Sequence, residues 1–117
     1  MSFNTGTTML DAVVLSVVAQ EQMGTYGYKI TQDVRNVMEI SESTLYPVLR
    51  RLQKDGYLET YDQECTGRNR RYYKITPNGM IKLDSFRNEW LEYRKKMDFI
   101  MMGLPMEGEG KPEERAD

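Results

Sequence analysis

The sequence predicts a small α+β domain that is mainly helical, and three observations lead to this fold class. Four segments repeat apolar residues at the helical spacing of three and four positions. Between the third and fourth segments, two runs rich in tyrosine, threonine and isoleucine flank a polar stretch, as in a β-hairpin. A length of 117 residues allows one domain with one modest core.

The composition describes a globular protein and excludes several kinds of chemistry. Hydrophobic residues make up 39% of the chain, and no run approaches the roughly 18 apolar residues of a membrane helix. Because the N-terminus lacks a signal pattern and Cys65 is the only cysteine, we expect a cytoplasmic protein without internal disulfides. The chain has no histidine, which excludes histidine-based acid/base catalysis and histidine metal ligands. We therefore expect no enzyme, no metal site and no cofactor.

The first predicted helix runs from Thr8 to about Glu21 and is apolar on almost every side. Such a helix is usually buried on more than one side, and a single modest core rarely surrounds a helix completely. Contact with a partner subunit is therefore favoured over the alternative, a central core helix of a monomer. One apolar stripe comprises Leu10, Val13, Val14, Val17 and Val18, and it is widened by Met9, Ala12, Leu15 and Ala19.

Two further helices follow. The second is expected from about Gly27 to Met38, with Ile30, Val34, Val37 and Met38 facing inward. The third contains the segment SESTLYPVLRRL, whose inward stripe is Leu45, Val48, Leu49 and Leu52. Its predicted N-cap is Ser41 or Ser43, and Asp55 and Gly56 predict its end.

The opposite face of the third helix carries polar groups that suit DNA recognition. Its residues at helical spacing are Ser43, Tyr46, Pro47, Arg50 and Lys54. Short hydroxyl groups approach base edges in the major groove, and arginines reach guanine or phosphate. Taken alone, this segment fits an ordinary solvated helix face equally well.

The hairpin that follows favours nucleic-acid binding. The segment GRNRRYYK contains four cations and no acid, although the chain as a whole has a net charge of −2. Such a concentration suits contact with phosphates or the minor groove, and the alternative is a solvated charge run. The polar segment DQECTGRN predicts a rather long hairpin tip. Three helices, a basic hairpin and a further helix predict a winged helix-turn-helix.

The last helix is predicted to dimerise the chain. Thr76 and Pro77 supply its N-cap and its first residue, and Gly103 and Pro105 mark its end. Apolar residues along it alternate in steps of three and four, as in a coiled-coil seam, which requires a second helix. The seam comprises Leu83, Phe86, Trp90, Tyr93, Met97, Ile100 and Leu104. The expected organisation is a DNA-binding domain (1–77), a dimerisation helix (78–104) and a disordered tail (105–117).

Three segments resemble the PadR family of bacterial transcriptional regulators: YGYKI, STLYPVLRRLQKDGYL and GRNRRYYKITPNG, within about Met9 to Met102. The resemblance implies a homodimer that binds an inverted-repeat operator in double-stranded DNA and represses transcription until an effector arrives. It also implies that the third helix enters the major groove. The short C-terminal helix resembles the small PadR subgroup typified by a lactococcal multidrug regulator. In that subgroup, a tryptophan at the position of Trp90 stacks on planar hydrophobic drugs.

These considerations together give three sets of candidate site residues. DNA contacts are expected from Lys29, Ser43, Thr44, Tyr46, Arg50, Arg68, Asn69, Arg70 and Arg71. A small planar hydrophobic ligand is expected at Trp90, Ala12, Leu15 and Phe86, and dimerisation at Leu83, Phe86, Trp90, Tyr93, Met97 and Ile100. In one alternative, Trp90 only packs in the seam. In another, the protein is a winged-helix interaction module whose basic wing binds an acidic protein without specific DNA binding.

Overall fold

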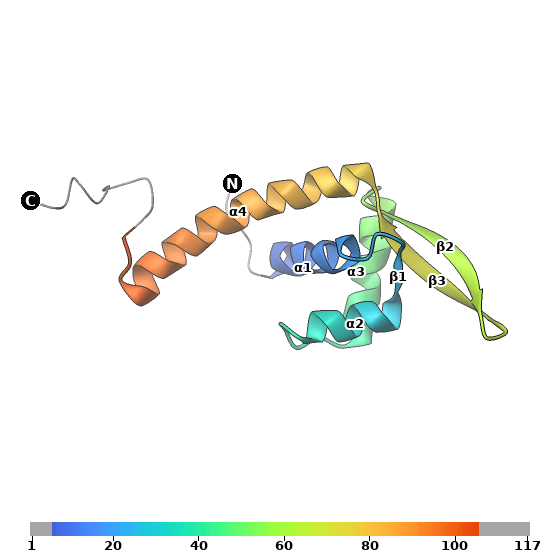
Figure 1. The fold of residues 1–117 in the computed structure, drawn as a ribbon. Helices are drawn as coiled ribbons and strands as arrows, with labels where there is room; N and C mark the ends of the chain where they lie inside the picture. Colours follow the sequence, from blue (N-terminus) through green and yellow to red (C-terminus); the bar gives the residue numbers. More distant parts are fainter. Residues whose placement is uncertain (1–5, 106–117) are drawn as a thin grey trace, which may run out of the picture.

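The computed structural model describes residues 6–105, which form four helices and one three-stranded antiparallel sheet (Figure 1). The helices are α1 (Thr7–Ala19), α2 (Gly27–Arg35), α3 (Glu42–Lys54) and α4 (Pro77–Met102). The strands are β1 (Thr25–Tyr26), β2 (Leu58–Cys65) and β3 (Arg68–Ile75). This arrangement confirms the predicted α+β, mainly helical fold class. The predicted disordered tail, residues 105–117, lies outside the described residues except for Pro105.

The sheet has the order β1-β3-β2, and its long hairpin is the wing. The ladder continues from Leu58 opposite Ile75 to Cys65 opposite Arg68. Only Thr66 and Gly67 form the turn, both with positive φ (51° and 78°), as in the tight turns that match strand twist. The prediction of a long polar tip was therefore wrong, because strand pairing extends through most of that segment. Strand β1, which has only two residues and pairs with β3, was not predicted.

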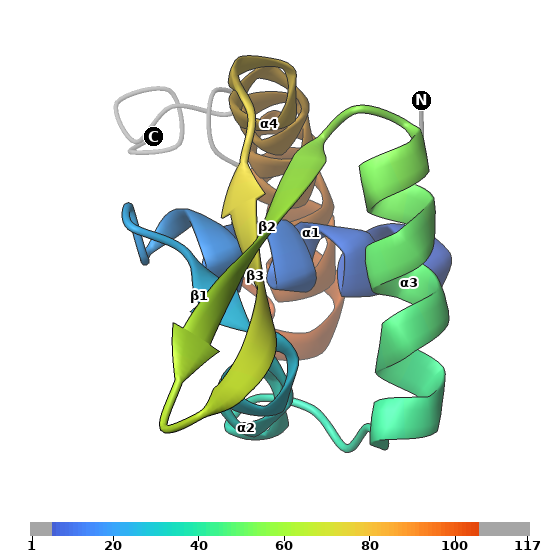
Figure 2. The same cartoon turned by 90° about the vertical axis from the view of Figure 1, so that its right-hand side faces the viewer.

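The core lies between the helices and one face of the sheet. Figure 2 shows the sheet in front of α1, with α3 to one side and α2 below. Helix α1 is nearly central, and α2, α3, the wing and the start of α4 all contribute to its surroundings. The fully buried apolar side chains of the core are Val14, Leu15, Val18, Ile30, Val34, Leu45, Leu49, Leu52 and Leu83.

The third helix follows its predicted pattern closely. Ser41 is the N-cap, since its hydroxyl accepts a hydrogen bond from the backbone N–H of Thr44 at 3.3 Å. Gly56 ends the helix with φ +85°, a conformation that costs glycine little. Pro47 lies inside the helix but is exposed, so its ring does not disturb the buried stripe.

The second helix is shorter than its apolar pattern predicts. It ends at Arg35, and the backbone turns at residues 36–38. Val37 is 71% exposed as a result, which corrects its prediction as an inward-facing residue. The backbone N–H groups of Asn36 and Val37 bond three residues back, to the carbonyls of Asp33 and Val34, so the chain departs from α-helical periodicity before Val37 reaches the core.

An ion pair joins α1 to α3. Arg51 donates two hydrogen bonds to the carboxylate of Asp11, at 2.9 and 2.6 Å. Asp11 is buried, and its hydrogen bond raises the pKa of the Arg51 guanidinium. Arg51 therefore helps to fix the position of α3, and its guanidinium is engaged within the protein, whereas the neighbouring Arg50 is exposed.

Breaking this ion pair from its two ends should have unequal effects. Arg51→Ala leaves a buried carboxylate without its partner, and we expect a loss of about 2–3 kcal/mol in the free energy of unfolding. Asp11→Ala leaves Arg51 in a half-exposed position where water solvates it, and we expect a loss of about 1 kcal/mol. Urea unfolding at one fixed protein concentration measures both values. Equal losses, or a larger loss for Asp11→Ala, would contradict the burial of Asp11 and the exposure of Arg51.

The fourth helix belongs partly to the core and partly to the surface. At its start, the hydroxyl of Thr76 accepts a hydrogen bond from the N–H of Gly79 at 2.9 Å, as an N-cap. Leu83 and Phe86 are buried against the chain's own core, which corrects their prediction as residues of the dimer seam. Farther along, α4 extends away from the rest of the fold (Figure 1), and Ile100 is 75% exposed. Within residues 6–105, no helix has the length and apolar character needed to cross a membrane.

Candidate nucleic-acid interface

The polar face of α3 is accessible along most of its length. Ser43, Thr44 and Arg50 are exposed, so they are available for contacts in a groove. Tyr46 is different, because it is half-buried and packs against the core. A methyl group added at Gly27 would lie 2.6 Å from the Tyr46 hydroxyl oxygen, which shows how closely Tyr46 approaches the start of α2. Tyr46 therefore joins the two helices of the helix-turn-helix as well as bordering its outer face.

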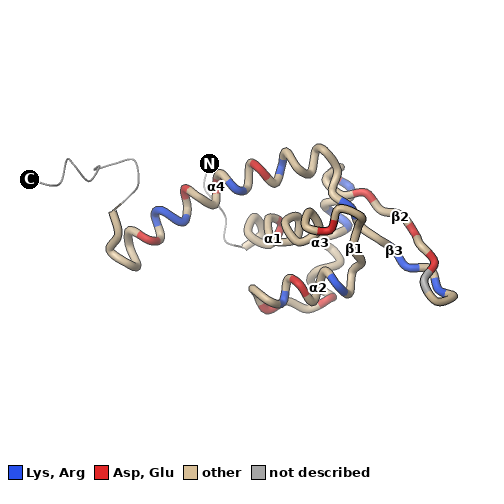
Figure 3. The backbone as a smooth tube through the Cα atoms, viewed as in Figure 1, with Lys and Arg blue, Asp and Glu red and all other residues tan. Residues whose placement is uncertain are grey.

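The wing has a basic strand beside an acidic one. Figure 3 shows cations on β3 and carboxylates on the neighbouring β2. In the ladder, Lys74 lies opposite Glu59 and Arg71 opposite Asp62, with 3.5 Å between Arg71 Nε and Asp62 Oδ1. The basic run alone does not reveal these carboxylates, because the sequence does not show which strand residues are paired.

Two wing arginines have no carboxylate opposite them. The ladder places Arg68 opposite Cys65 and Arg70 opposite Gln63. Among the described residues, neither arginine forms an ion pair. Arg68 and Arg70 are therefore the wing cations that are least neutralised by the protein, and Asn69 lies exposed between them.

Lys29 lies among acidic side chains. Its ammonium donates to Asp33 at 3.0 Å and to Glu21 at 3.3 Å. These hydrogen bonds, first to Asp33 and then to Glu21, raise the pKa of Lys29. A phosphate contact, as predicted for Lys29, would compete with both carboxylates. The adjacent Tyr28 is 60% exposed at the start of α2, and sequence reasoning did not select it.

Tyr73 marks the inner side of the wing. It is buried, and burial raises the pKa of its phenol, although the nearby charges of Arg71 and Arg50 act in the opposite direction. Its hydroxyl therefore stays protonated at neutral pH. Because side chains alternate along a strand, Asn69 and Arg71 share the side of β3 that carries Tyr73, whereas Arg68 and Arg70 project from the other side.

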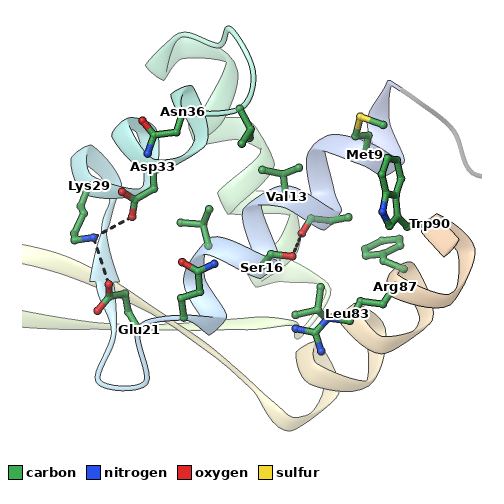
Figure 4. A pocket seen from close by; sticks show the side chains of 15 residues that line it. Met9, Val13, Ser16, Glu21, Lys29, Asp33, Asn36, Leu83, Arg87 and Trp90 are labelled. Atoms are coloured by element: carbon green, nitrogen blue, oxygen red, sulfur yellow. Dashed lines mark hydrogen bonds and ion pairs between the residues drawn. The ribbon is translucent and has the colours of Figure 1, made fainter. Parts of the chain in front are cut away.

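An open groove of about 610 Å³ lies between α1, α2 and α4 (Figure 4). Three of the predicted ligand residues, Ala12, Phe86 and Trp90, line it. Leu15, the fourth, is fully buried and does not line the groove. Its assignment as a ligand residue is corrected, because its face of α1 packs into the core. The end of the groove opposite Trp90 carries Lys29 with Glu21 and Asp33.

Comparisons with known proteins agree with this architecture. Residues 14–85 match the family described as "Transcriptional regulator PadR-like family". Over 73 residues, the chain is 36% identical to transcriptional regulator Rv3488 of Mycobacterium tuberculosis, covering 62% of this chain and 68% of that relative. It is similar to the structure of smu.1704 from Streptococcus mutans, with a TM-score of 0.77 and 38% identity, covering 88% of this chain and 95% of that one. A PadR family transcription regulator from Clostridium difficile is also similar, with a TM-score of 0.68, 28% identity, and coverages of 80% and 98%.

Proposed function

Because the chain belongs to the PadR-like family of transcriptional regulators, we propose that it is a dimeric repressor that binds an inverted-repeat operator in double-stranded DNA. Members of this family are transcriptional regulators, so the prediction that the chain is not an enzyme is confirmed. The predicted winged helix-turn-helix is confirmed as well. The proposed role belongs in the cytoplasm, where bacterial DNA is accessible.

One observation carries the proposal: an exposed polar helix face lies in the same domain as wing arginines that lack carboxylate partners. On α3, Ser43, Thr44 and Arg50 offer hydroxyl and guanidinium groups of the kind that read base edges in the major groove. On the wing, Arg68 and Arg70 offer charge for phosphates. Tyr46, Asn69 and Arg71 border these groups, and we retain them as proposed contacts.

The experiment that tests this function compares two duplexes over a range of salt concentrations. One duplex comes from the region upstream of the protein's own gene, and the other has the same length and a random sequence. We expect tighter binding to the first duplex and a steep loss of affinity with salt for both. Salt-independent binding, or none, would favour the alternative of an interaction module that binds an acidic protein.

Dimerisation is supported by the distal part of α4. Beyond the core contacts of Leu83 and Phe86, this helix and the residues directly after it carry a series of large apolar side chains that are exposed in the single chain. They are Phe99, Ile100, Met101, Met102 and Leu104. An apolar surface of this kind typically marks an interaction site, and a twofold dimer is the commonest way to cover it. Trp90, Tyr93 and Met97 continue the proposed interface toward the core.

Ile100→Asp should weaken the dimer. A carboxylate placed in an apolar seam loses hydration without gaining a partner, so we expect the dimer dissociation constant to rise at least tenfold from a micromolar or lower value. Sedimentation equilibrium measures this constant. Asn88→Asp, at an exposed polar position of the same helix, is the matched control and should leave it unchanged. A wild-type monomer at micromolar concentration would contradict the dimer.

We also propose that a planar hydrophobic molecule acts as the effector, as in the multidrug-responsive PadR subgroup. Support comes from the groove, in which Trp90 is 39% exposed beside Phe86 and Ala12. An indole ring stacks well on flat aromatic ligands, and a positively charged ligand gains a further cation–π contribution.

A planar aromatic cation such as ethidium should quench Trp90, the only tryptophan of the chain. We expect saturable quenching in the wild type and, in Trp90→Ala, at least a tenfold loss of ethidium affinity by calorimetry, because the stacking partner is absent. Trp90→Phe, which keeps an aromatic ring, should retain part of the affinity. Loss of the dimer in Trp90→Ala, together with no quenching in the wild type, would assign Trp90 to packing alone.

A further inference from the structure

We propose that Tyr26 is a positioning residue that holds the Arg70 guanidinium ready for a phosphate of bound DNA. The inference rests on the proposed function, since it concerns a wing arginine in the proposed interface. It adds a residue from outside the wing hairpin, in the short strand β1, to the DNA-binding surface. Tyr26 acts through Arg70 and requires no contact of its own with DNA.

The geometry joins these two side chains directly. The Arg70 guanidinium carbon lies 4.2 Å from the centre of the Tyr26 ring, within the range of a cation–π interaction. β1 pairs with β3 so that Tyr26 lies opposite Tyr72. Arg70 is two residues from Tyr72 along β3 and therefore projects from the same side of the sheet. The contact is thus a diagonal cross-strand pair, a distance that long side chains can span.

This contact restrains Arg70 without neutralising it. A free arginine side chain loses much rotamer freedom when it binds, and a side chain that is already ordered loses less. The neighbouring Arg71 is restrained differently, because the Asp62 carboxylate lies 3.5 Å from its Nε. A phosphate must compete with that carboxylate for Arg71, whereas the Tyr26 ring leaves the full positive charge of Arg70 available.

The Tyr26 ring is itself held in place by two other tyrosines on the same side of the sheet. The Tyr26 and Tyr72 rings pack in a T-shaped arrangement, with 5.6 Å between centroids and 70° between planes. Tyr61 stacks on the other side of Tyr72 at 5.4 Å and 13°, and the Tyr61 hydroxyl donates a hydrogen bond to the carbonyl of Met23. Because Tyr26 is also the residue that precedes α2, this cluster links Arg70 to the first helix of the helix-turn-helix.

Tyr26→Leu removes the π face but keeps an apolar side chain. Ordering one rotamer-rich side chain on binding lowers affinity by roughly two- to tenfold, and ordering one in each of two subunits lowers it by roughly five- to a hundredfold. We expect this loss in the affinity for duplex DNA. Tyr26→Phe retains the ring and should bind within about twofold of the wild type. Tyr26 makes no side-chain capping hydrogen bond to α2, so neither variant removes a helix cap.

A double-mutant cycle separates positioning from a general structural role. In an Arg70→Ala background, Tyr26→Leu should cost less than twofold in affinity, because its partner is absent. In an Arg71→Ala background, which is the matched control on the same strand, Tyr26→Leu should cost as much as in the wild type. Equal losses in the two backgrounds would overturn the proposal, as would wild-type affinity of Tyr26→Leu.

A second measurement does not depend on DNA or on the stability of a variant. The Tyr26 ring current should shift the NMR signals of the Arg70 Cδ protons upfield in the free wild-type protein. Signals at the positions of an ordinary exposed arginine would overturn the proposal. If the wild type shows the shift but binds no duplex, then the proposed function fails and not the contact. If it binds duplex and Arg70→Ala changes nothing, then the positioning role fails and DNA binding stands.

Discussion

Replacing both Arg68 and Arg70 by alanine is expected to reduce the affinity of the dimer for duplex DNA by roughly 10³-fold at 0.15 M salt. Each phosphate contact contributes about 0.9 to the slope of log K against log salt, so two arginines in each of two subunits contribute about 3.6. Extrapolated from 1 M to 0.15 M salt, this slope corresponds to about three orders of magnitude. The physical reason is counterion release, which does not depend on sequence. The affinity of this variant for operator and for random duplexes should therefore fall by the same factor.

Fluorescence anisotropy titrations at four or more salt concentrations measure both the affinity and the slope. The control is Lys82→Gln with Arg87→Gln, which removes two positive charges from α4, away from the wing tip (Figure 3). These substitutions should leave the slope nearly unchanged, because only charges at the interface displace counterions. An unchanged slope in the wing variant would exclude Arg68 and Arg70 from the interface. If the slope falls by the same amount in the control, then the change in net charge explains the result and contacts of the wing arginines are not needed.

Gly79→Ala is expected to lower the free energy of unfolding by about 3 kcal/mol, the upper part of the range for overpacked sites. A methyl group at Gly79 would collide with the backbone carbonyl oxygen of Tyr57 and lie 2.6 Å from Ile75 Cγ1. The Tyr57 carbonyl cannot easily move, because it accepts a hydrogen bond from the backbone N–H of Thr76 at 3.1 Å. The clash therefore acts where α4 begins, beside the start of β2 and the end of β3.

Thermal and urea unfolding at fixed concentration measure this loss, and Gly56→Ala is the matched control. Gly56 has φ +85° and open space around it, so its substitution adds only left-handed backbone strain, about 1–2 kcal/mol. We expect Gly79→Ala to be clearly less stable than Gly56→Ala. If the two losses are equal, or if Gly79→Ala is the milder change, then the start of α4 is packed less tightly against Tyr57 than the geometry indicates.

Local signals in the sequence were enough to predict most of the elements. The buried stripe of α3, its serine cap and its terminal glycine each depend on residues within a few positions of one another. Thr76 and Pro77 likewise start α4 as expected. The errors arose where a sequence pattern and the element itself did not end at the same residue. Val37 continued an apolar period after α2 had already ended, and the wing ladder continued through a segment that looked like a loop.

The candidate site could be predicted only in part, because burial and pairing depend on contacts between distant residues. Ala12 and Leu15 both lie on the apolar α1, yet only Ala12 lines the groove. The charge of Lys29 is engaged by Glu21, eight residues away, and by Asp33. The pair with Asp33 has the i,i+4 spacing of a helix, which the sequence shows, but no period or spacing reports the pair with Glu21.

The sequence by itself determined the α+β class, the order of the four helices and the positions of the basic wing residues, because helix periodicity, caps and composition are local properties of the chain. Tertiary structure alone decided which charges remain available. Arg51 is tied to the buried Asp11 forty residues away, whereas Arg70 lies against Tyr26 across the sheet. Each of the two arginines belongs to an Arg-Arg pair in the sequence, 50–51 and 70–71. They differ because folding places a carboxylate beside one guanidinium and an aromatic ring beside the other.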